Sequence, residues 1–252
     1  MVAVANVINN QIFSPCGGIA LSNAKFPTSF ANVLSIAQHD LYTAPAGRRA
    51  AIFPCYGANA GGTPSSVTSQ PELKTGGSYY PLQIASTTAQ NALIGTPSKP
   101  IILEPGESAS VNVTSLASAL AYGFPIVEFD SSIPFKTAKL TTLASGNNTL
   151  YTCPANTKAF ILDSNLAIGS AAAQINYYNG SGGALTVQVY LVNSAGSQAT
   201  TNSTSTALSV SNGLFGTFLT SANLNAGDFI VINTSAATAT QFAWVNILEV
   251  PG

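Results

Sequence analysis

The residues that could carry out acid–base or nucleophilic chemistry are few and scattered along this chain of 252 residues. The single histidine, His39, precedes Asp40, and a His–Asp pair can orient a serine or cysteine nucleophile. Adjacent residues of a strand point to opposite faces, however, and the sequence has no Gly-x-Ser-x-Gly motif. We therefore interpret His39 as a loop histidine and expect no catalytic residue.

The acidic residues are densest at Glu104, Glu107, Glu128 and Asp130. Two carboxylates can hydrolyse a glycoside, or can bind Ca²⁺ together with carbonyl oxygens. Glu104 and Glu107 flank a Pro-Gly turn, which indicates solvated side chains, whereas Glu128 has a counterpart in Glu249. The sequence has no Asp-x-Asp-x-Asp-Gly loop. It therefore predicts no metal site and no cofactor site, and it predicts a structural position for Glu128 and Glu249.

Cysteine and arginine allow both functional and structural interpretations. Cys16, Cys55 and Cys153 are odd in number and lack Cys-x-x-Cys spacing, so we expect small buried thiols, and the sequence leaves one disulfide open. Arg48 and Arg49 form the only basic pair. They either face an acidic neighbouring subunit or lie in a solvated turn.

Adjacent tyrosines occur at Tyr79-Tyr80 and Tyr177-Tyr178. Such rings suit a sugar-binding face and suit protein–protein contacts equally well. Asn-x-Ser/Thr triplets begin at Asn112, Asn147, Asn179, Asn202 and Asn233. A chain this rich in Asn, Ser and Thr contains such triplets by chance, and they do not indicate glycosylation.

Charge is the most unusual property of the composition. Charged residues make up 7 % of the chain, against roughly 25 % in an ordinary soluble domain, and the formal net charge is −1. Eight scattered basic residues are too few to form a binding surface for nucleic acid or for an anionic membrane.

The hydrophobic content of 46 % excludes intrinsic disorder. No stretch of 18 apolar residues predicts a transmembrane helix, and the first residues lack the basic region of a secretory signal. We expect a nearly neutral surface that packs against other proteins.

The sequence contains an internal duplication. Residues 41–52 (LYTAPAGRRAAI) match residues 150–161 (LYTCPANTKAFI) at a spacing of 109, with Gly47 opposite Asn156. Both residue types tolerate a left-handed backbone, so the exchange preserves a turn. Two further pairs match at a spacing of 121, namely 103–107 (LEPGE) with 224–228 (LNAGD) and 126–129 (IVEF) with 247–250 (ILEV). Three pairs in the same order predict two copies of one module.

The repeat suggests the domain boundaries. We expect an N-terminal arm over residues 1–28, a first module over 29–135 and a second module over 136–252, with 131–136 as the linker. A module of this length is normal for a β-sandwich. The arm either adds an extended strand to a neighbouring subunit or lies on its own domain.

The local patterns predict an all-β chain. Residues 184–192 alternate, with Leu185, Val187, Val189 and Leu191 on one face. The chain has 21 Gly and 14 Pro, which interrupt it too often for long helices. Short helices could form at 116–122 and at 85–94. The predicted fold class is all-β, with two tandem jelly-roll-like β-sandwich domains and an extended N-terminal arm.

The motif Leu-Tyr-Thr-x-Pro-Ala, followed by a basic residue and a β run, resembles a motif of tailed-bacteriophage virion proteins. The segments 176–192 (NYYNGSGGALTVQVYLV) and 224–230 (LNAGDFI) are also similar to such proteins. The resemblance covers most of residues 140–250 and only parts of the first module. It implies a β-sandwich module of capsid decoration, neck, tail or fibre proteins, without choosing among them.

The expected function is that of a structural virion protein that stabilises the phage capsid surface as a cement or decoration protein, without catalysis. Its partners would be the major capsid protein or other virion proteins and further copies of itself, with a trimer as the expected oligomer. Neither nucleic acid nor a membrane is an expected partner. The expected location is the virion, on the capsid surface or tail, after synthesis in the host cytoplasm. The alternatives are a neck, tail or fibre component of the same particle, and a carbohydrate-binding adhesin module.

Overall fold

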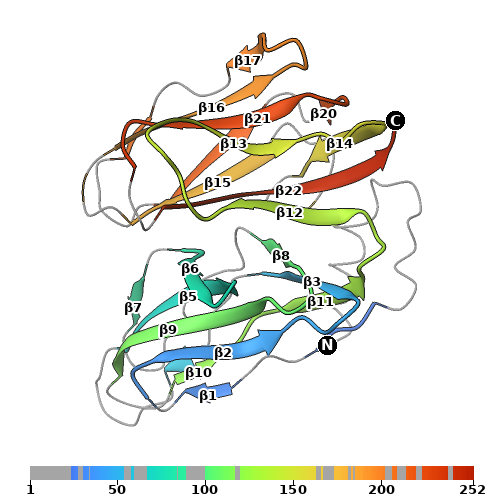
Figure 1. The fold of residues 1–252 in the computed structure, drawn as a ribbon. Helices are drawn as coiled ribbons and strands as arrows, with labels where there is room; N and C mark the ends of the chain where they lie inside the picture. Colours follow the sequence, from blue (N-terminus) through green and yellow to red (C-terminus); the bar gives the residue numbers. More distant parts are fainter. Residues whose placement is uncertain are drawn as a thin grey trace. The chain divides into compact units, whose positions relative to one another are not determined.

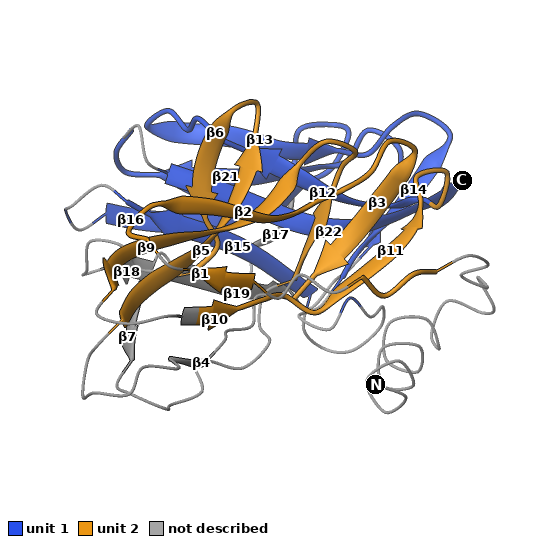
Figure 2. Ribbon diagram, turned by 90° about the horizontal axis from the view of Figure 1, so that it is seen from below, with its two compact units in different colours: residues 1–20, 134–252 blue, residues 21–133 orange. Residues whose placement is uncertain are grey.

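The chain is all-β in a computed structural model, which shows strands and turns and no helix in the residues that it describes. The described residues are 24–27, 31–33, 35–53, 58–59, 67–83, 85–88, 100–116, 120–162, 166, 173–180, 183, 185–201, 206–208, 214–219, 223–237 and 241–252. Among them no helix is long and apolar enough to cross a membrane. The chain divides into two compact units, unit 2 over residues 21–133 and unit 1, whose described part is 134–252 (Figure 2).

Unit 2 is built from three antiparallel sheets. Its strands are β1 (Ala31–Val33), β2 (Gln38–Thr43), β3 (Arg48–Ile52), β4 (Ala58–Asn59), β5 (Val67–Thr75), β6 (Ser78–Pro81), β7 (Ser86–Thr88), β8 (Ile101–Leu103), β9 (Ser108–Leu116), β10 (Leu120–Tyr122) and β11 (Ile126–Asp130). The pairing orders are β2-β9-β5-β6, with β7 also on β5, then β1-β10-β4 and β11-β3-β8. Buried side chains of the unit include Val67, Leu73, Ile101, Leu103, Val111 and Val127.

Unit 1 is built from two antiparallel sheets (Figure 1). Its strands are β12 (Phe135–Leu140), β13 (Gly146–Thr152), β14 (Thr157–Ile161), β15 (Ala173–Asn179), β16 (Leu185–Val192), β17 (Gln198–Thr201), β18 (Thr206–Leu208), β19 (Leu214–Leu219), β20 (Asn223–Leu224), β21 (Phe229–Thr234) and β22 (Gln241–Pro251). One sheet has the order β13-β21-β16-β17, with β18 also on β16, and the other has the order β19-β15-β22-β14-β20, with β12 also on β22.

The core of unit 1 lies between its two sheets. Leu185, Val187, Val189 and Leu191 are buried on the inner face of β16, which confirms the alternation predicted from the sequence. They join one cluster with buried residues of the opposite sheet, namely Ala159, Ile161, Ile175, Tyr177, Ala243, Val245 and Ile247. A core shared by two facing sheets makes the unit a β-sandwich, and the strands at its two ends, β12 and β22, pair with each other.

The two units pair their strands in the same order and in the same register. The order β2-β9-β5-β6 of unit 2 corresponds to β13-β21-β16-β17 of unit 1. Ala31 pairs with Tyr122 in unit 2, and Leu140 pairs with Ala243 in unit 1. Leu140 lies 109 residues after Ala31, and Ala243 lies 121 residues after Tyr122, which are the two spacings of the sequence repeat. Residues aligned by the sequence repeat therefore occupy equivalent positions in the strand pairs of the two units.

The equivalent turns make the same hydrogen bonds. Gly106 N–H donates to the Ala44 carbonyl at 2.8 Å, and Gly227 N–H donates to the Cys153 carbonyl at 2.9 Å. Both glycines have a left-handed backbone, with φ of 87° and 84°. Gly47 and Asn156, matched in the sequence, likewise have φ of 72° and 59°. The exchange of Gly for Asn therefore preserves the turn, as predicted.

The two predicted short helices are wrong where the structure describes them. Residues 120–122 form β10, which pairs with β1 on one side and β4 on the other, and residues 86–88 form β7. Residues 117–119 and 89–94 lie outside the described residues. The Ala/Leu composition favours a helix, but pairing with neighbouring strands overrides so weak a local preference.

Most of the predicted N-terminal arm, residues 1–23 and 28, lies outside the described residues. The described part includes Lys25, whose backbone N–H donates to the Glu128 carbonyl at 3.0 Å and whose carbonyl accepts from Glu128 N–H at 2.9 Å. Lys25 therefore pairs with a strand of its own chain. The segment predicted as a linker forms a turn at Ser131–Ile133 and the start of β12.

Candidate binding surface

His39 lies in strand β2 and not in a loop as predicted, and it points to a different partner from Asp40. His39 Nε2 lies 3.0 Å from the Ser35 carbonyl oxygen, whereas Asp40 lies 2.5 Å from Lys74 Nζ and accepts a hydrogen bond from Ser110 Oγ at 2.8 Å. Burial opposes ionisation of Asp40, but the hydrogen bonds from Lys74 and Ser110 and the charge of Lys74 outweigh it and lower the pKa of this carboxyl. Asp40 therefore serves an ion pair rather than orienting the histidine.

The two arginines lie in strand β3 and pair with acidic residues of their own unit, so the interpretation of a solvated turn is wrong. Arg49 Nε donates to Glu104 at 2.8 Å, and Nη1 donates to the Ser131 and Ile133 carbonyls at 3.0 and 2.9 Å. Arg48 Nε lies 3.5 Å from Glu128. Glu104 is partly solvated, with 36 % of its side chain exposed, and its carboxylate also pairs with a guanidinium.

The remaining acidic residues of this group hold turns. Glu107 accepts the backbone N–H of Glu104 at 2.8 Å, and Asp130 accepts that of Ser132 at 2.8 Å. The equivalent of Glu107 in unit 1, Asp228, accepts Asn225 N–H at 2.9 Å. The described part of the chain holds no group of three or more His, Cys, Asp or Glu that could bind a metal ion.

Glu128 and Glu249 occupy structural positions, as predicted. Tyr42 donates its hydroxyl hydrogen to Glu128 at 2.7 Å, and Tyr151 donates to Glu249 at 2.6 Å. Burial and the adjacent carboxylate raise the pKa of both phenols far above their ordinary value. Each carboxylate also has a cation, Arg48 for Glu128 and Lys136 for Glu249.

The tyrosine pairs do not form a sugar-binding face as a set. Tyr177 and Tyr178 are 1 % and 4 % exposed, so neither ring is available to a ligand in this structure. Tyr79 is half-buried, with Lys74 Nζ 5.0 Å from its ring centre. Among the cysteines, Cys153 is buried and burial raises the pKa of its thiol, whereas Cys16 and Cys55 lie outside the described residues.

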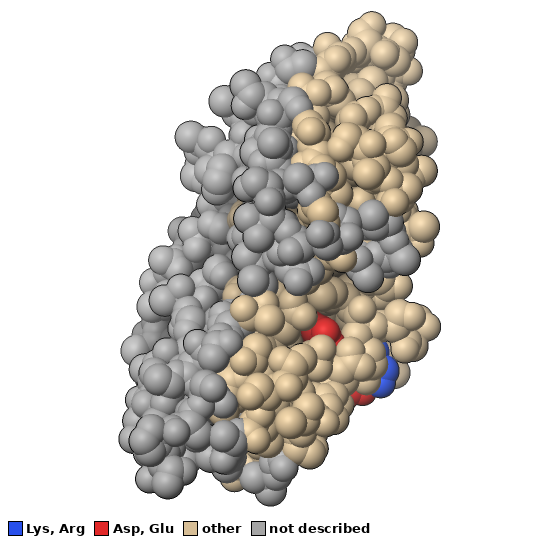
Figure 3. All heavy atoms as spheres, turned by 90° about the vertical axis from the view of Figure 1, so that its left-hand side faces the viewer, with Lys and Arg blue, Asp and Glu red and all other residues tan. Residues whose placement is uncertain are grey.

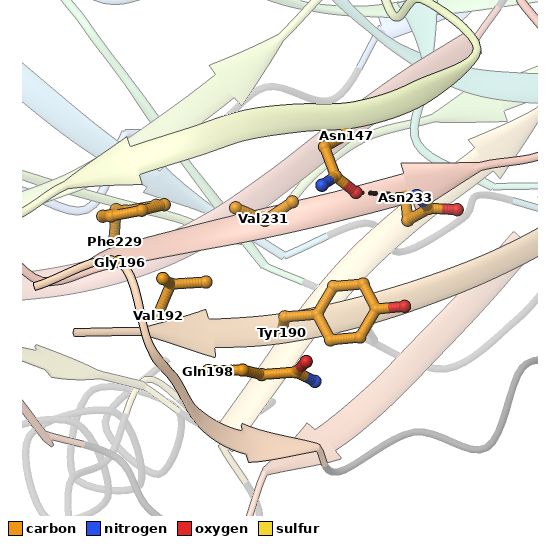
Figure 4. Close-up of a pocket in the computed structure, with 8 residues that line it drawn as sticks. All are labelled: Asn147, Tyr190, Val192, Gly196, Gln198, Phe229, Val231 and Asn233. Carbon is orange, nitrogen blue, oxygen red and sulfur yellow. Dashed lines mark hydrogen bonds between the residues drawn. The ribbon is translucent and has the colours of Figure 1, made fainter.

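A hollow on the outer face of the sheet β13-β21-β16-β17 was not identified from the sequence. It has a volume of about 450 Å³. Its wall carries two aromatic rings and three amides, from Tyr190, Phe229, Asn147, Asn233 and Gln198. Figure 4 shows the Tyr190 ring between Val231 and Gln198, with Phe229 toward one end and the two asparagines toward the other.

The alternation of each strand produces this lining. In β16 the inward residues are core aliphatics, so Gln188, Tyr190 and Val192 point outward. Val231 of β21 pairs with Tyr190, and Asn233 pairs with both Gln188 and Asn147. Because these residues come from strands far apart in the sequence, no local motif reveals them. The outward positions of the 185–192 alternation were the one available signal.

Charged side chains are sparse on one face of the molecule (Figure 3) and are absent from the lining of the hollow. Figure 3 shows one face of the molecule on which the described atoms belong almost entirely to residues other than Lys, Arg, Asp and Glu. The hollow itself is lined by no charged residue. The arrangement can therefore bind a neutral partner through apolar contact and amide hydrogen bonds.

Comparison with known proteins gives no family. No family model matches the chain, and no curated protein matches it. Among solved structures, recombinant N-glycanase F (PNGase F) aligns over 92 % of this chain and 96 % of its own, at 11 % identity and a TM-score of 0.34.

Two viral structures align less well. The triple jelly-roll protein of the turret assembly in an archaeal virus aligns over 93 % of this chain and 61 % of its own, at 13 % identity and a TM-score of 0.27. A structure of infectious bursal disease virus, Gx strain, aligns over 96 % and 77 %, at 11 % identity and a TM-score of 0.25. At these TM-scores the matches do not establish what this chain does.

Proposed function

We propose that this chain is a structural protein of a virus particle, which binds the phage capsid surface as a cement or decoration protein and has no catalytic role. The observation that supports the proposal is the use of the few charged side chains inside each unit. Four ion pairs of the described residues join Arg48 to Glu128, Arg49 to Glu104, Lys74 to Asp40 and Lys136 to Glu249. In each pair the two charges lie close to a partner of opposite sign, so the surface carries few charges without a neighbouring counter-charge.

A neutral exterior lowers the free-energy cost of association. Moving an ionised side chain out of water costs several kcal/mol unless it is paired, whereas Ser, Thr, Asn and Ala lose much less. A protein that covers joints between subunits must bury a large part of its own surface. The composition and the internal pairing of charges together suit such a position.

The proposed mechanism is binding alone. Copies of the chain, with a trimer as the proposed oligomer, would contact the major capsid protein or another virion protein and stabilise the assembled particle by mass action. The proposed location is the virion surface. A neck, tail or fibre position in the same particle is the alternative, and the number of copies distinguishes it.

The test is made on purified particles from cells that produce this chain. Quantitative mass spectrometry should find the chain in the particles at a copy number comparable to that of the shell protein, whereas a tail component would be present in far fewer copies. Particles depleted of the chain should rupture at a lower temperature, and adding back the purified chain should restore rupture to the original temperature. Absence of the chain from purified particles would overturn the proposal.

Treating the particles with high salt tests whether neutral contacts or ion pairs hold the chain on the particle. A contact made by neutral side chains should survive high salt, because screening weakens only charge–charge attraction. Release of the chain from particles by salt alone would show that ion pairs hold it there, and would contradict the neutral-surface explanation while leaving the location intact.

A further inference from the structure

We propose that the hollow on the outer face of β13-β21-β16-β17 binds a neutral oligosaccharide, with the Tyr190 ring as a stacking surface and side-chain amides as hydrogen-bonding partners. This inference concerns a ligand site and does not depend on where in a particle the chain is placed.

The aromatic residues supply the apolar part of the site. Tyr190 is half-buried, so one part of its ring packs on the sheet while another part faces the hollow. Its hydroxyl donates to the Gln188 side chain, which lies on the same face of β16 and fixes the ring. Phe229 and Val192, which pair across strands β21 and β16, line the hollow beside the ring, in a wall whose exposed surface is otherwise mainly polar. The C–H faces of a sugar ring pack on such rings, which combine large area with little conformational freedom.

The amides supply polar groups of the kind that recognise hydroxyls. Asn233 Nδ2 donates to Asn147 Oδ1 at 2.6 Å, which holds the two side chains together (Figure 4). That bond leaves Asn147 Nδ2 as a donor and Asn233 Oδ1 as an acceptor, and both residues line the same hollow as Tyr190. A donor and an acceptor side by side match neighbouring hydroxyls of a sugar, each of which can both donate and accept. Gln198 offers a third amide on the other side of the ring (Figure 4).

The absence of charge in the lining selects the class of sugar. None of the residues that line the hollow is Lys, Arg, Asp or Glu. An acidic glycan would have to desolvate its carboxylate without a cation to receive it, which is costly. The hollow is also open and about 450 Å³ in volume, so it suits one or two sugar rings of a longer chain rather than an enclosed small molecule.

The equivalent face of unit 2 shows that the hollow is not a by-product of the repeat. Six residues that line the hollow have counterparts at the same register positions of unit 2. In order, the residues of unit 1 are Asn147, Tyr190, Val192, Phe229, Val231 and Asn233, and their counterparts are Gln38, Glu72, Lys74, Ser108, Ser110 and Asn112. In unit 2 these side chains bind one another: Gln38 donates to Glu72 at 2.9 Å, and Asp40 pairs with Lys74. The same scaffold is thus filled by its own polar network in unit 2 and presents rings and amides in unit 1.

The test measures sugar binding by the full chain. The probes are an array of neutral oligosaccharides built from glucose, mannose, galactose or N-acetylglucosamine, with sialylated versions as the acidic set, and calorimetry up to millimolar concentrations on those that bind. We expect a neutral oligosaccharide to bind and its sialylated or otherwise acidic analogue to bind more weakly. Tyr190→Ala should weaken binding by about tenfold or more, because the stacking surface is lost.

Matched variants locate the site. Asn147→Ala, at an exposed position, should weaken binding, whereas Gln38→Ala, its equivalent in unit 2, should leave binding unchanged. Tyr190→Phe keeps the ring and should retain most of the affinity. Circular dichroism and thermal unfolding of each variant verify folding, and Asn147→Ala decides the matter if Tyr190→Ala does not fold.

Two results would overturn the inference. The first is that no neutral oligosaccharide binds the folded chain at millimolar concentration. The second is sugar binding that neither Tyr190→Ala nor Asn147→Ala weakens, which would place the sugar site elsewhere on the chain. Incorporation into particles is measured separately, so failure here and failure of the proposed virion role are distinguishable.

Discussion

Tyr42 donates a hydrogen bond to Glu128 across 2.7 Å, although 86 residues separate them in the sequence. The bond joins β2 to β11, which belong to different sheets of unit 2. Tyr151 and Glu249 repeat it in unit 1 at 2.6 Å, between β13 and β22. Each unit therefore has the same part-buried phenol–carboxylate bond between two of its sheets.

We expect Tyr42→Phe to destabilise the protein. The substitution leaves the Glu128 carboxylate, which is 6 % exposed, without one of its donors, and hydrogen bonds to charged groups contribute about 1.5–3 kcal/mol. Tyr151→Phe should cost a similar amount through Glu249. Urea denaturation measures the free energy of unfolding of both variants. Because the two bonds lie in separate units, the double variant should lose the sum of the two free energies. A loss well short of that sum would contradict the independence of the two bonds.

Gly227→Ala should destabilise the protein more than Gly106→Ala. Both glycines have positive φ, so a side chain costs about 1 kcal/mol or more at either position. A Cβ at Gly227 would also lie 2.9 Å from Ser194 Cβ, whereas a Cβ at Gly106 meets nothing within 4 Å. Thermal or urea unfolding of the two variants compares them directly. Equal destabilisation would show that Ser194 moves aside freely.

Glu72→Gln should make the stability of the protein less dependent on pH. Glu72 is 3 % exposed, and burial raises its pKa above the ordinary value of 4.5, although hydrogen bonds from Gln38 and Asn112 oppose the rise. A raised pKa in the folded state means that the folded protein binds the proton more tightly than the unfolded chain does. Its contribution to stability is therefore complete below pH 4.5 and is lost as pH rises through the raised pKa.

The measurement for Glu72 is the free energy of unfolding of both proteins from below pH 4.5 to neutral pH. The gain of the Gln variant over the wild type should grow with pH, because glutamine accepts the Gln38 hydrogen bond without a buried charge. A difference that stays constant over this range, or that shrinks as pH rises, would contradict the assignment.

Cys153 should resist alkylation in the folded protein. Its side chain is 1 % exposed, and burial raises the pKa of the thiol, so little reactive thiolate forms. Labelling with iodoacetamide, read by mass spectrometry of the Cys153 peptide, should be slow in buffer and rapid in urea. Cys16→Ser and Cys55→Ser in the same chain remove disulfide exchange as an alternative route. Fast labelling of Cys153 without denaturant would contradict the buried position.

The sequence predicted the repeated framework because its signals are local or come in matched pairs. The turns at Gly47 and Asn156 need a left-handed backbone, and that need is visible in the residue types themselves. The strand 185–192 is visible from its alternation. The segment 120–122 was misread as helical because its Ala and Leu content outweighed another signal, its alignment with β22 at a spacing of 121.

The contacts across strands could not be predicted in the same way. Arg49 and Glu104 are 55 residues apart, and only the pairing of β3 with β8 brings them together. The hollow depends likewise on Tyr190, Asn147 and Gln198 meeting from three strands. A pattern within one strand states which side chains face outward, but not which outward side chains become neighbours.

The position of β22 determines when unit 1 can be completed during translation. β12, β14 and β15, which the ribosome makes first, all pair with β22, whose residues 241–251 emerge some 60 or more residues after β15. Until then three strands carry open edges in a nascent chain of low charge, a state prone to aggregation. Unit 2 has its own closing strand at Ile126–Asp130 and can fold while unit 1 is still being made. Because β1, β4 and β3 likewise wait for β10 and β11, chaperone demand during synthesis should rise twice, before residues 120–130 and again before residues 241–251 emerge.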